Sequence, residues 1–157
     1  MPLLLILWRK GIDKQKEVFL GVDYGKKRIG LAFASAPLLI TLPIGNIDTP
    51  PSLALTAQAL VAIAKERAVT TIVFGNPLPM QKAYASSLQS EIQELAALVQ
   101  EMTSLEVILW DERLSSAQAE RMLKNDCGLS RKQRKHSSDS LAATLILSSF
   151  LDFRKLY

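Results

Sequence analysis

Two short apolar runs joined by a tight turn place the strongest constraint on the fold. The first run covers Val18–Tyr24 and the second covers Ile29–Ala34, with Gly25-Lys26-Lys27-Arg28 between them. Apolar runs of this length, linked by a few residues that include glycine, predict a β-hairpin. One residue does not fit an ordinary hairpin, because Asp23 puts a carboxylate at the end of a strand expected in a sheet core. Burial of a carboxylate is costly unless something binds it, so Asp23 is a candidate ligand.

The later apolar patterns alternate between strands and helices. Strands are predicted over Leu42–Ile47, Thr70–Phe74 and Glu106–Trp110, and helices over Leu53–Arg67, a stripe from Tyr84 to Met102, Ser115–Asn125 and Asp139–Phe153. Ser52 is the expected N-cap of the first helix. In the last helix one face is predicted to contain Ala142, Leu145, Ile146, Ser149 and Phe153. A strand meander followed by βαβ crossovers predicts an α/β fold with a mixed five-stranded sheet, antiparallel first and parallel after, and helices on both faces.

The length and composition favour one folded domain. With 157 residues and 48% hydrophobic residues, the chain can form a substantial core, and we expect a single domain over residues 17–157 behind an N-terminal extension of residues 1–16. The lone Cys127 cannot form an internal disulfide, which favours a cytoplasmic location. The net charge of +4 is compatible with a nucleic-acid partner but does not establish one.

The N-terminal extension is apolar from Leu3 to Trp8. This run is too short to span a bilayer, and it lacks the charged start and small-residue cleavage site of a signal peptide. We expect an extra strand, a packed tail or a mis-assigned start rather than a membrane-surface anchor, and no membrane partner.

Acidic residues follow or precede the predicted elements at three places. Asp23 ends the first strand, Asp111 and Glu112 end the last strand, and Asp139 begins the last helix. In open α/β sheets the working crevice lies outside the carboxyl ends of the strands, so these groups could converge there. Grouped carboxylates repel one another, and a hard divalent cation with oxygen ligands would remove that conflict. Each acid also has a plainer interpretation: a turn residue, a surface ion pair with Arg113, or a helix-dipole partner.

Basic residues adjoin two of these acidic positions. Lys26, Lys27 and Arg28 follow Asp23, and the predicted loop before Asp139 contains Arg131, Lys132, Arg134 and Lys135. A solvated cationic surface is the plain interpretation. The functional one is that these residues, with Arg113, bind a phosphate backbone next to the carboxylates. His136 has no Cys or His partners, so it does not indicate a zinc site.

Four segments in order resemble the motifs of the YqgF/RuvX family of RNase H-like nucleases. They are LGVDYGKKRIGLA, VFGNPLPM, WDERLSSAQAE and SRKQRKHSSDSLAATLILSSFLD, and the resemblance extends over roughly residues 18–152. The second motif departs from the family pattern, with Asn76 where Leu is frequent, Pro79 in place of Asn and Gln81 in place of Asp. The departure puts in doubt any role of that loop in metal binding.

The resemblance implies an RNase H-like fold related to the resolvase RuvC, in a bacterial cytoplasmic protein. It implies that the family's acidic positions fall on Asp23, on Asp111 or Glu112, and on Asp139. Asp23 would bridge two Mg²⁺ (or Mn²⁺) ions, and the others would each hold one. Strand alternation turns Asp111 and Glu112 to opposite sides, so one of the two is expected to face the metals.

Three functions remain open at this point. The first is a metal-dependent nuclease, which we expect to process the 5′ end of pre-16S rRNA in ribosome biogenesis, or else to resolve Holliday junctions in branched DNA. The second is a non-catalytic module that binds ribosomal RNA or a pre-ribosomal particle. The third is a nucleotide hydrolase of the actin/Hsp70 type, whose phosphate loop DxGxxxxGxA matches Asp23 to Ala32; the chain lacks the second copy that such proteins need. The expected state is a monomer or a homodimer.

Overall fold

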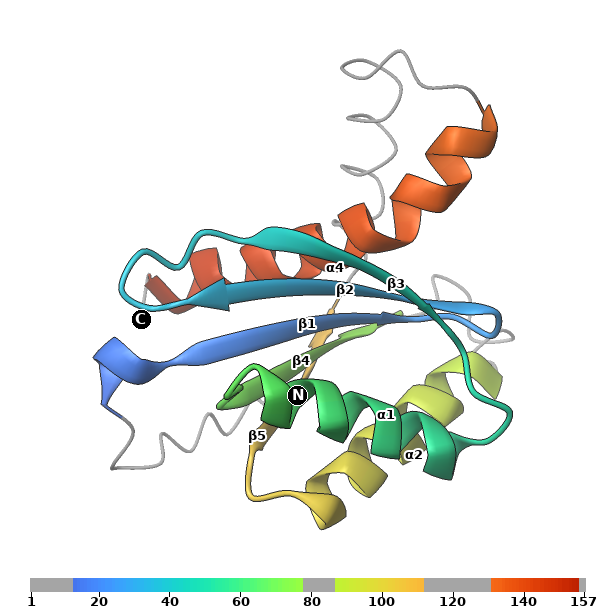
Figure 1. Ribbon diagram of the computed structural model, residues 1–157, viewed down its shortest axis with the longest axis horizontal. Coiled ribbons are helices and arrows are strands. Elements are labelled where there is room, and N and C mark those ends of the chain that lie inside the picture. The colour runs from blue at the N-terminus through green and yellow to red at the C-terminus, as the bar shows by residue number, and fades with distance from the viewer. Residues whose placement is uncertain (1–12, 78–86, 112–130, 156–157) are drawn as a thin grey trace.

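The computed structural model describes residues 13–77, 87–111 and 131–155, with only the backbone described over residues 131–139 (Figure 1). A short 3-10 helix η1 (Lys14–Lys16) precedes the first strand. The elements that follow are β1 (Val18–Tyr24), β2 (Arg28–Ser35), β3 (Leu42–Asp48), α1 (Leu53–Glu66), β4 (Thr71–Asn76), α2 (Ser87–Met102), β5 (Glu106–Asp111) and α4 (Arg131–Lys155). The helix predicted over Ser115–Asn125 lies outside the described residues.

The five strands form one mixed sheet in the order β3-β2-β1-β4-β5. Strands β1, β2 and β3 pair antiparallel, whereas β1 pairs with β4 and β4 with β5 in parallel. In the parallel part, Val22 of β1 is the Cα partner of Phe74 of β4, which in turn is the partner of Leu109 of β5. The predicted mixed five-stranded sheet is confirmed, and the carboxyl ends of β1, β4 and β5 share one edge.

The hairpin turn between β1 and β2 is fixed by backbone contacts. A Cβ atom at Gly25 would lie 2.6 Å from the carbonyl oxygen of Arg28, so the tight turn requires glycine there. From the far end of β3, Thr49 donates its hydroxyl to the Gly25 carbonyl at 2.7 Å and its amide to the Lys27 carbonyl at 3.0 Å. The turn therefore presents its basic residues from a defined backbone.

Helices cover both faces of the sheet, as predicted (Figure 1). On one face α1 and α2 pack on a cluster that includes Leu20, Val22 and Phe74. On the other face α4 packs on Phe19 and Val73. The expected N-cap of α1 is confirmed, because Ser52 Oγ accepts the Leu55 amide at 3.2 Å. Within the described ranges, no helix has both the length and the hydropathy needed to cross a bilayer.

Helix α4 differs from the prediction in its start and in its buried face. It begins at Arg131 instead of Asp139, so the segment predicted as a basic loop is helical from Arg131 onward. Arginine, lysine and glutamine favour helices, and no glycine or proline interrupts residues 131–155. The buried residues from 143 onward are Ala143, Ile146, Leu147, Phe150 and Leu151, so of the predicted face only Ile146 is fully buried.

The contact with β1 explains this phase of α4. The segment Leu141–Leu147 is apolar at almost every position, so periodicity alone allows more than one buried face. At Gly21, a Cβ atom would lie 2.9 Å from Leu147 Cβ and 3.0 Å from the Ala143 carbonyl oxygen. The missing side chain lets this face of α4 approach the strand backbone.

Two smaller predictions also need correction. Met102, predicted in the buried stripe of α2, is the last residue of the helix and is 43% exposed, where it lines an open cleft. Gly75 and Asn76, predicted in a loop, continue β4 in register with Trp110 and Asp111 of β5.

The C-terminal part of α4 is fastened to the start of β1. Arg154 donates through both guanidinium nitrogens to the two carboxylate oxygens of Glu17, with Nη1–Oε2 at 2.9 Å, and the side chains are only 16% and 12% exposed. The same guanidinium lies 5.1 Å from the ring centre of Phe19. Trp110 of β5 adds an edge-on contact to Phe150 at 5.5 Å and donates its indole N–H to Ser149 Oγ at 3.2 Å.

Gly21→Ala should destabilise the fold by about 1–3 kcal/mol, because the added methyl overpacks the contact between β1 and α4. Urea denaturation measures the change in the free energy of unfolding. Combining it with Leu147→Gly should cost less than the sum of the single changes, since the second removes the Leu147 Cβ atom that the added methyl would meet at 2.9 Å. Strictly additive costs would show that the close contact does not set the position of the helix.

Arg154→Gln should lower the free energy of unfolding by about 1–3 kcal/mol, because it leaves the little-exposed Glu17 carboxylate without its bidentate partner. Lys155→Gln is the matched control, since it removes the neighbouring cation from an exposed pair with Asp152 at 3.7 Å. The control should leave the thermal midpoint unchanged. Equal effects of the two substitutions would contradict the role assigned to the Glu17–Arg154 pair.

Candidate functional site

Asp23 lies on the face of the sheet that α4 covers, one residue before β1 ends. Phe19 packs beneath α4, and strand alternation puts Gly21 and Asp23 on the same face. The Cα partner of Asp23 on β2 is Gly30. On the other side, one register step beyond the Val22–Phe74 pair, comes Gly75. A half-buried carboxylate thus sits in the central strand between two residues without side chains.

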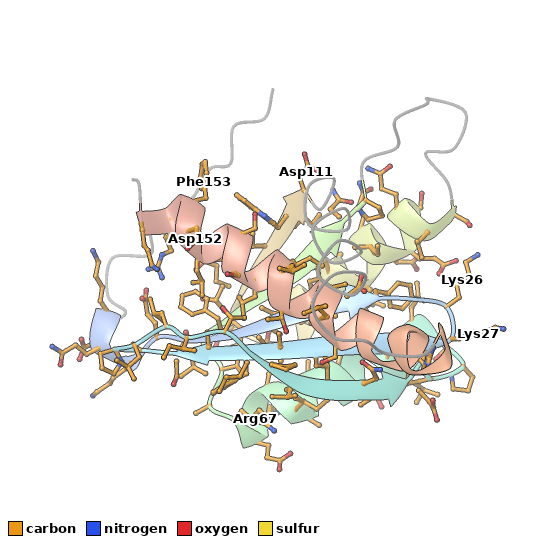
Figure 2. All side chains as sticks on the ribbon, turned by 90° about the horizontal axis from the view of Figure 1, so that it is seen from above. Lys26, Lys27, Arg67, Asp111, Asp152 and Phe153 are labelled. Carbon is orange, nitrogen blue, oxygen red and sulfur yellow. The ribbon has the colours of Figure 1, made fainter. Side chains whose placement is uncertain are left out.

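Asp111 ends β5 at the same edge of the sheet but on the other face. Ile108 and Trp110 belong to the cluster under α4, whereas Val107 packs with the cluster under α1 and α2. Alternation therefore assigns Asp111 to the face opposite Asp23. Its side chain is exposed at the end of β5 (Figure 2). Glu112, the next residue, lies outside the described residues.

Asn76 is the Cα partner of Asp111 on β4. Its side-chain oxygen is buried and accepts no hydrogen bond in the part of the chain that the structure describes. The resemblance to the family identified Asn76 as a departure from the family pattern. In the structure Asn76 ends β4 and lies beside Asp111 at the end of β5.

Position 139 belongs to the row of α4 that faces β1. Phe150 lies 6.1 Å from Phe19 between ring centres, and Leu147 and Ala143 lie over Gly21, so α4 runs antiparallel to β1 above it. Asp139 comes one helical turn before Ala143. Continuing this course brings the backbone at 139 toward the end of β1; the Asp139 side chain is not among those described.

The predicted basic residues fall into two groups at the hairpin end of the sheet. Lys26 and Lys27 are exposed in the turn (Figure 2), and Arg28 begins β2 half-buried. The first turns of α4 extend beyond the sheet at that same end (Figure 1), and they contain Arg131, Lys132, Arg134 and Lys135. The side chains of this second group, and the whole of Arg113, lie outside the described part.

A hydrogen-bonded network that the sequence did not reveal connects the hairpin to α2. The Tyr24 hydroxyl donates to Glu91 Oε2 at 3.1 Å. Lys26 Nζ lies 3.7 Å from Glu91 Oε1 and donates to Ser87 Oγ at 3.3 Å. Burial first, and then the hydrogen bond and charge of Glu91, raise the pKa of Tyr24, so it remains a donor at neutral pH. These partners are far apart in the chain, and no local pattern marks them.

The described side chains do not by themselves complete a metal site. Among them, no three Asp, Glu, His or Cys groups lie together as a metal ion would require. Two of the predicted ligands, Glu112 and Asp139, are not part of that set.

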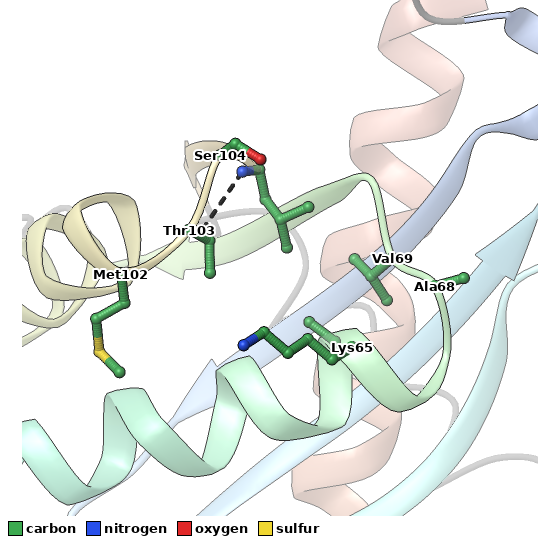
Figure 3. Close-up of a pocket in the computed structure, with 8 residues that line it drawn as sticks. Lys65, Ala68, Val69, Met102, Thr103 and Ser104 are labelled. Atoms are coloured by element: carbon green, nitrogen blue, oxygen red, sulfur yellow. Dashed lines mark hydrogen bonds between the residues drawn. The ribbon is translucent and has the colours of Figure 1, made fainter.

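A cleft of about 340 Å³ lies at the other end of the sheet (Figure 3). It opens between the ends of α1 and α2, where Lys65 and Met102 line it with the residues that lead into β4 and β5. These are the amino ends of the parallel strands, whereas Asp23 and Asp111 mark the carboxyl ends. The cleft is therefore separate from the acidic edge.

Comparison with known proteins gives the family. The model of RuvX, described as Holliday junction resolvase, matches residues 17–153. A relative in Chlamydia muridarum is 90% identical over 144 residues, covering 92% of this chain and 97% of its own length. Relatives in Chlamydia trachomatis serovar L2 and Chlamydia pneumoniae are 84% and 63% identical, covering 93% and 87% of this chain and 99% and 90% of their own lengths. All three carry the provisional name pre-16S rRNA nuclease.

Solved structures support the fold. RuvC of T. thermophilus, in complex with a Holliday junction substrate, superposes with a TM-score of 0.56 at 14% identity, covering 87% of this chain and 96% of that one. The Fowlpox virus resolvase, in complex with Holliday junction DNA, also gives 0.56, at 9% identity and with 86% and 97% covered. The predicted RNase H-like fold is confirmed. From its fold and its sequence relatives together, the chain belongs to the RuvX family and is a nuclease.

Proposed function

We propose that this protein uses divalent metal ions to hydrolyse the backbone of structured RNA, in maturation of the 5′ end of pre-16S rRNA. The observation that carries the proposal is Asp23, a half-buried carboxylate on the central strand, under the row of α4 that leads to Asp139. The provisional names of the Chlamydia relatives support this substrate. The junction complexes of the structural neighbours make branched DNA the alternative substrate.

The chemistry of the donor set fits magnesium. The proposed ligands are carboxylates, which Mg²⁺ prefers, and the glycines beside Asp23 bring no side chain that would compete for the position. Of the acidic pair we assign the ligand role to Glu112, since alternation turns Asp111 away from the face of Asp23. Asp23, Glu112 and Asp139 would then hold the metal. When bound, two such ions activate a water and stabilise the leaving oxygen in phosphodiester cleavage.

The remaining residues have positioning roles. Asp23 is held by a strand with neighbours on both sides, and Asp139 belongs to a helix fastened at Gly21 and at Glu17. The basic residues of the hairpin turn and of the first turns of α4, together with Arg113, would bind phosphates on either side of the cut. Because such contacts do not read base identity, the shape of the RNA would determine the site of cleavage.

Asp23→Asn should reduce Mg²⁺-dependent cleavage roughly 100-fold or more while preserving the fold, because the amide is nearly isosteric but cannot neutralise a cation. The assay compares a pre-16S rRNA fragment with a four-way DNA junction and maps the ends produced. Asp152→Asn, exposed at the opposite end of the sheet (Figure 2), is the control. Unchanged cleavage by Asp23→Asn would contradict the assignment. Tight RNA binding without cleavage by the unmodified protein would favour the binding module instead.

Glu112→Gln should lose cleavage as severely as Asp23→Asn, whereas Asp111→Asn should stay within a few-fold of the unmodified protein. The reason is that strand alternation turns Asp111 away from the face of Asp23 and would turn the residue after it toward that face. Calorimetric titration with Mn²⁺ provides a readout independent of activity, and only Glu112→Gln should weaken the binding. The reverse pattern would assign the ligand role to Asp111.

A further inference from the structure

Lys26 is engaged within the protein despite its place in the exposed hairpin turn. Its ammonium group lies 3.7 Å from Glu91 Oε1 and donates to Ser87 Oγ at 3.3 Å, both on α2. Its side chain is 62% exposed and that of Glu91 is 30% exposed. A lysine available to solvent, with a carboxylate as its partner, can exchange that partner for another anion.

Glu91 is held more firmly than Lys26. Its second oxygen accepts the hydroxyl of Tyr24 at 3.1 Å, and Tyr24 is buried in the cluster beneath α1 and α2. The carboxylate is thus fixed from the core on one side and presented to Lys26 on the other. Lysine, by contrast, carries a point charge on a flexible stem with rotatable donors.

A phosphate can replace the carboxylate at little cost. Exposed ion pairs contribute little net stability, so release of Lys26 leaves the fold intact. A nucleic-acid backbone offers the same kind of oxygen ligand and gains counterion-release entropy for each cation it acquires. The turn that carries Lys26 is fixed by Thr49, so only the lysine side chain needs to move.

We propose that Glu91 competes with the nucleic-acid backbone for Lys26: it holds the lysine against α2 in the free protein and yields it to a phosphate on binding. The proposal rests on the nuclease function above, which directs nucleic acid to the hairpin end of the sheet. Glu91 is then a positioning residue that limits affinity for the backbone and so favours release of bound chains.

The test is a double-mutant cycle on binding, read by fluorescence anisotropy of a labelled single-stranded RNA fragment in EDTA, over a range of KCl concentrations. Glu91→Gln should tighten binding about three- to ten-fold and steepen the slope of log K against log salt by about 0.7. In a protein that already has Lys26→Gln, Glu91→Gln should not change the affinity, because the cation for which Glu91 competes is absent. Glu94→Gln, which removes an exposed carboxylate from the same helix, should leave affinity within two-fold.

Different results would contradict the competition for Lys26 and the proposed nuclease function. An equal effect of Glu91→Gln with and without Lys26 would mean general charge repulsion and would overturn the competition. Absence of nucleic-acid binding by the unmodified protein would overturn the proposed function itself. Glu91→Gln keeps an oxygen that can accept the Tyr24 hydroxyl, so it should fold. Glu91→Ala, which loses that contact, should show the same shift in affinity if charge competition is the cause.

Discussion

The rest of the structure depends on the direct contact of α4 with the backbone of β1 at Gly21. With no side chain at this position, Ala143 and Leu147 can lie against the central strand. This contact fixes the rotation of the helix about its axis. A rotation by one residue would bury a different row, and position 139 would turn away from the end of β1. One missing methyl group therefore decides which row of α4 lies against the central strand.

Contacts at the two ends of the sheet hold this arrangement in place. The Trp110–Phe150 contact fastens α4 to β5 near the carboxyl end of that strand. At the amino end of β1, the Glu17–Arg154 pair fastens the same helix. At the other end, Thr49 fixes the hairpin turn, and Tyr24 joins it to α2 through Glu91. Carboxylates that bind metal ions must be placed to within a fraction of an ångström, and rigid neighbours on both sides of the acidic edge meet that need.

Most of the fold could be predicted from the sequence because its signals are local. The hairpin, the mixed antiparallel and parallel pairing of the strands and the two helical layers follow from apolar periodicity and the glycine in the turn, and the structure confirms them. The phase of α4 could not be predicted, because apolar residues at nearly every position from Leu141 to Leu147 permit several buried faces. Only the contact with Gly21, a partner more than a hundred residues away, selects one.

The candidate site likewise has features that the sequence predicts and others that only the structure shows. Asp23 could be proposed as a ligand from the sequence because a carboxylate at the end of an apolar strand is locally anomalous. The face on which Asp111 lies could not be predicted, since only the packing of Ile108 and Trp110 beneath α4 shows which face each position of β5 takes. The contact between Lys26 and Glu91 could not be predicted from the sequence, because it joins two solvent-accessible charged residues on different elements.

Charge placement at the hairpin end follows from opposing requirements. A site that gathers carboxylates repels the phosphate backbone that it must cut, so cations have to lie close by. Too many free cations would hold the polyanion indiscriminately and slow its release. In the proposed competition, a lysine paired with Glu91 would meet both needs, because it would be available when a phosphate arrives and partly neutralised when none is present. Since Glu91 is oriented by the buried Tyr24, a single carboxylate connects the core of the protein to the basic hairpin turn that we propose binds nucleic acid.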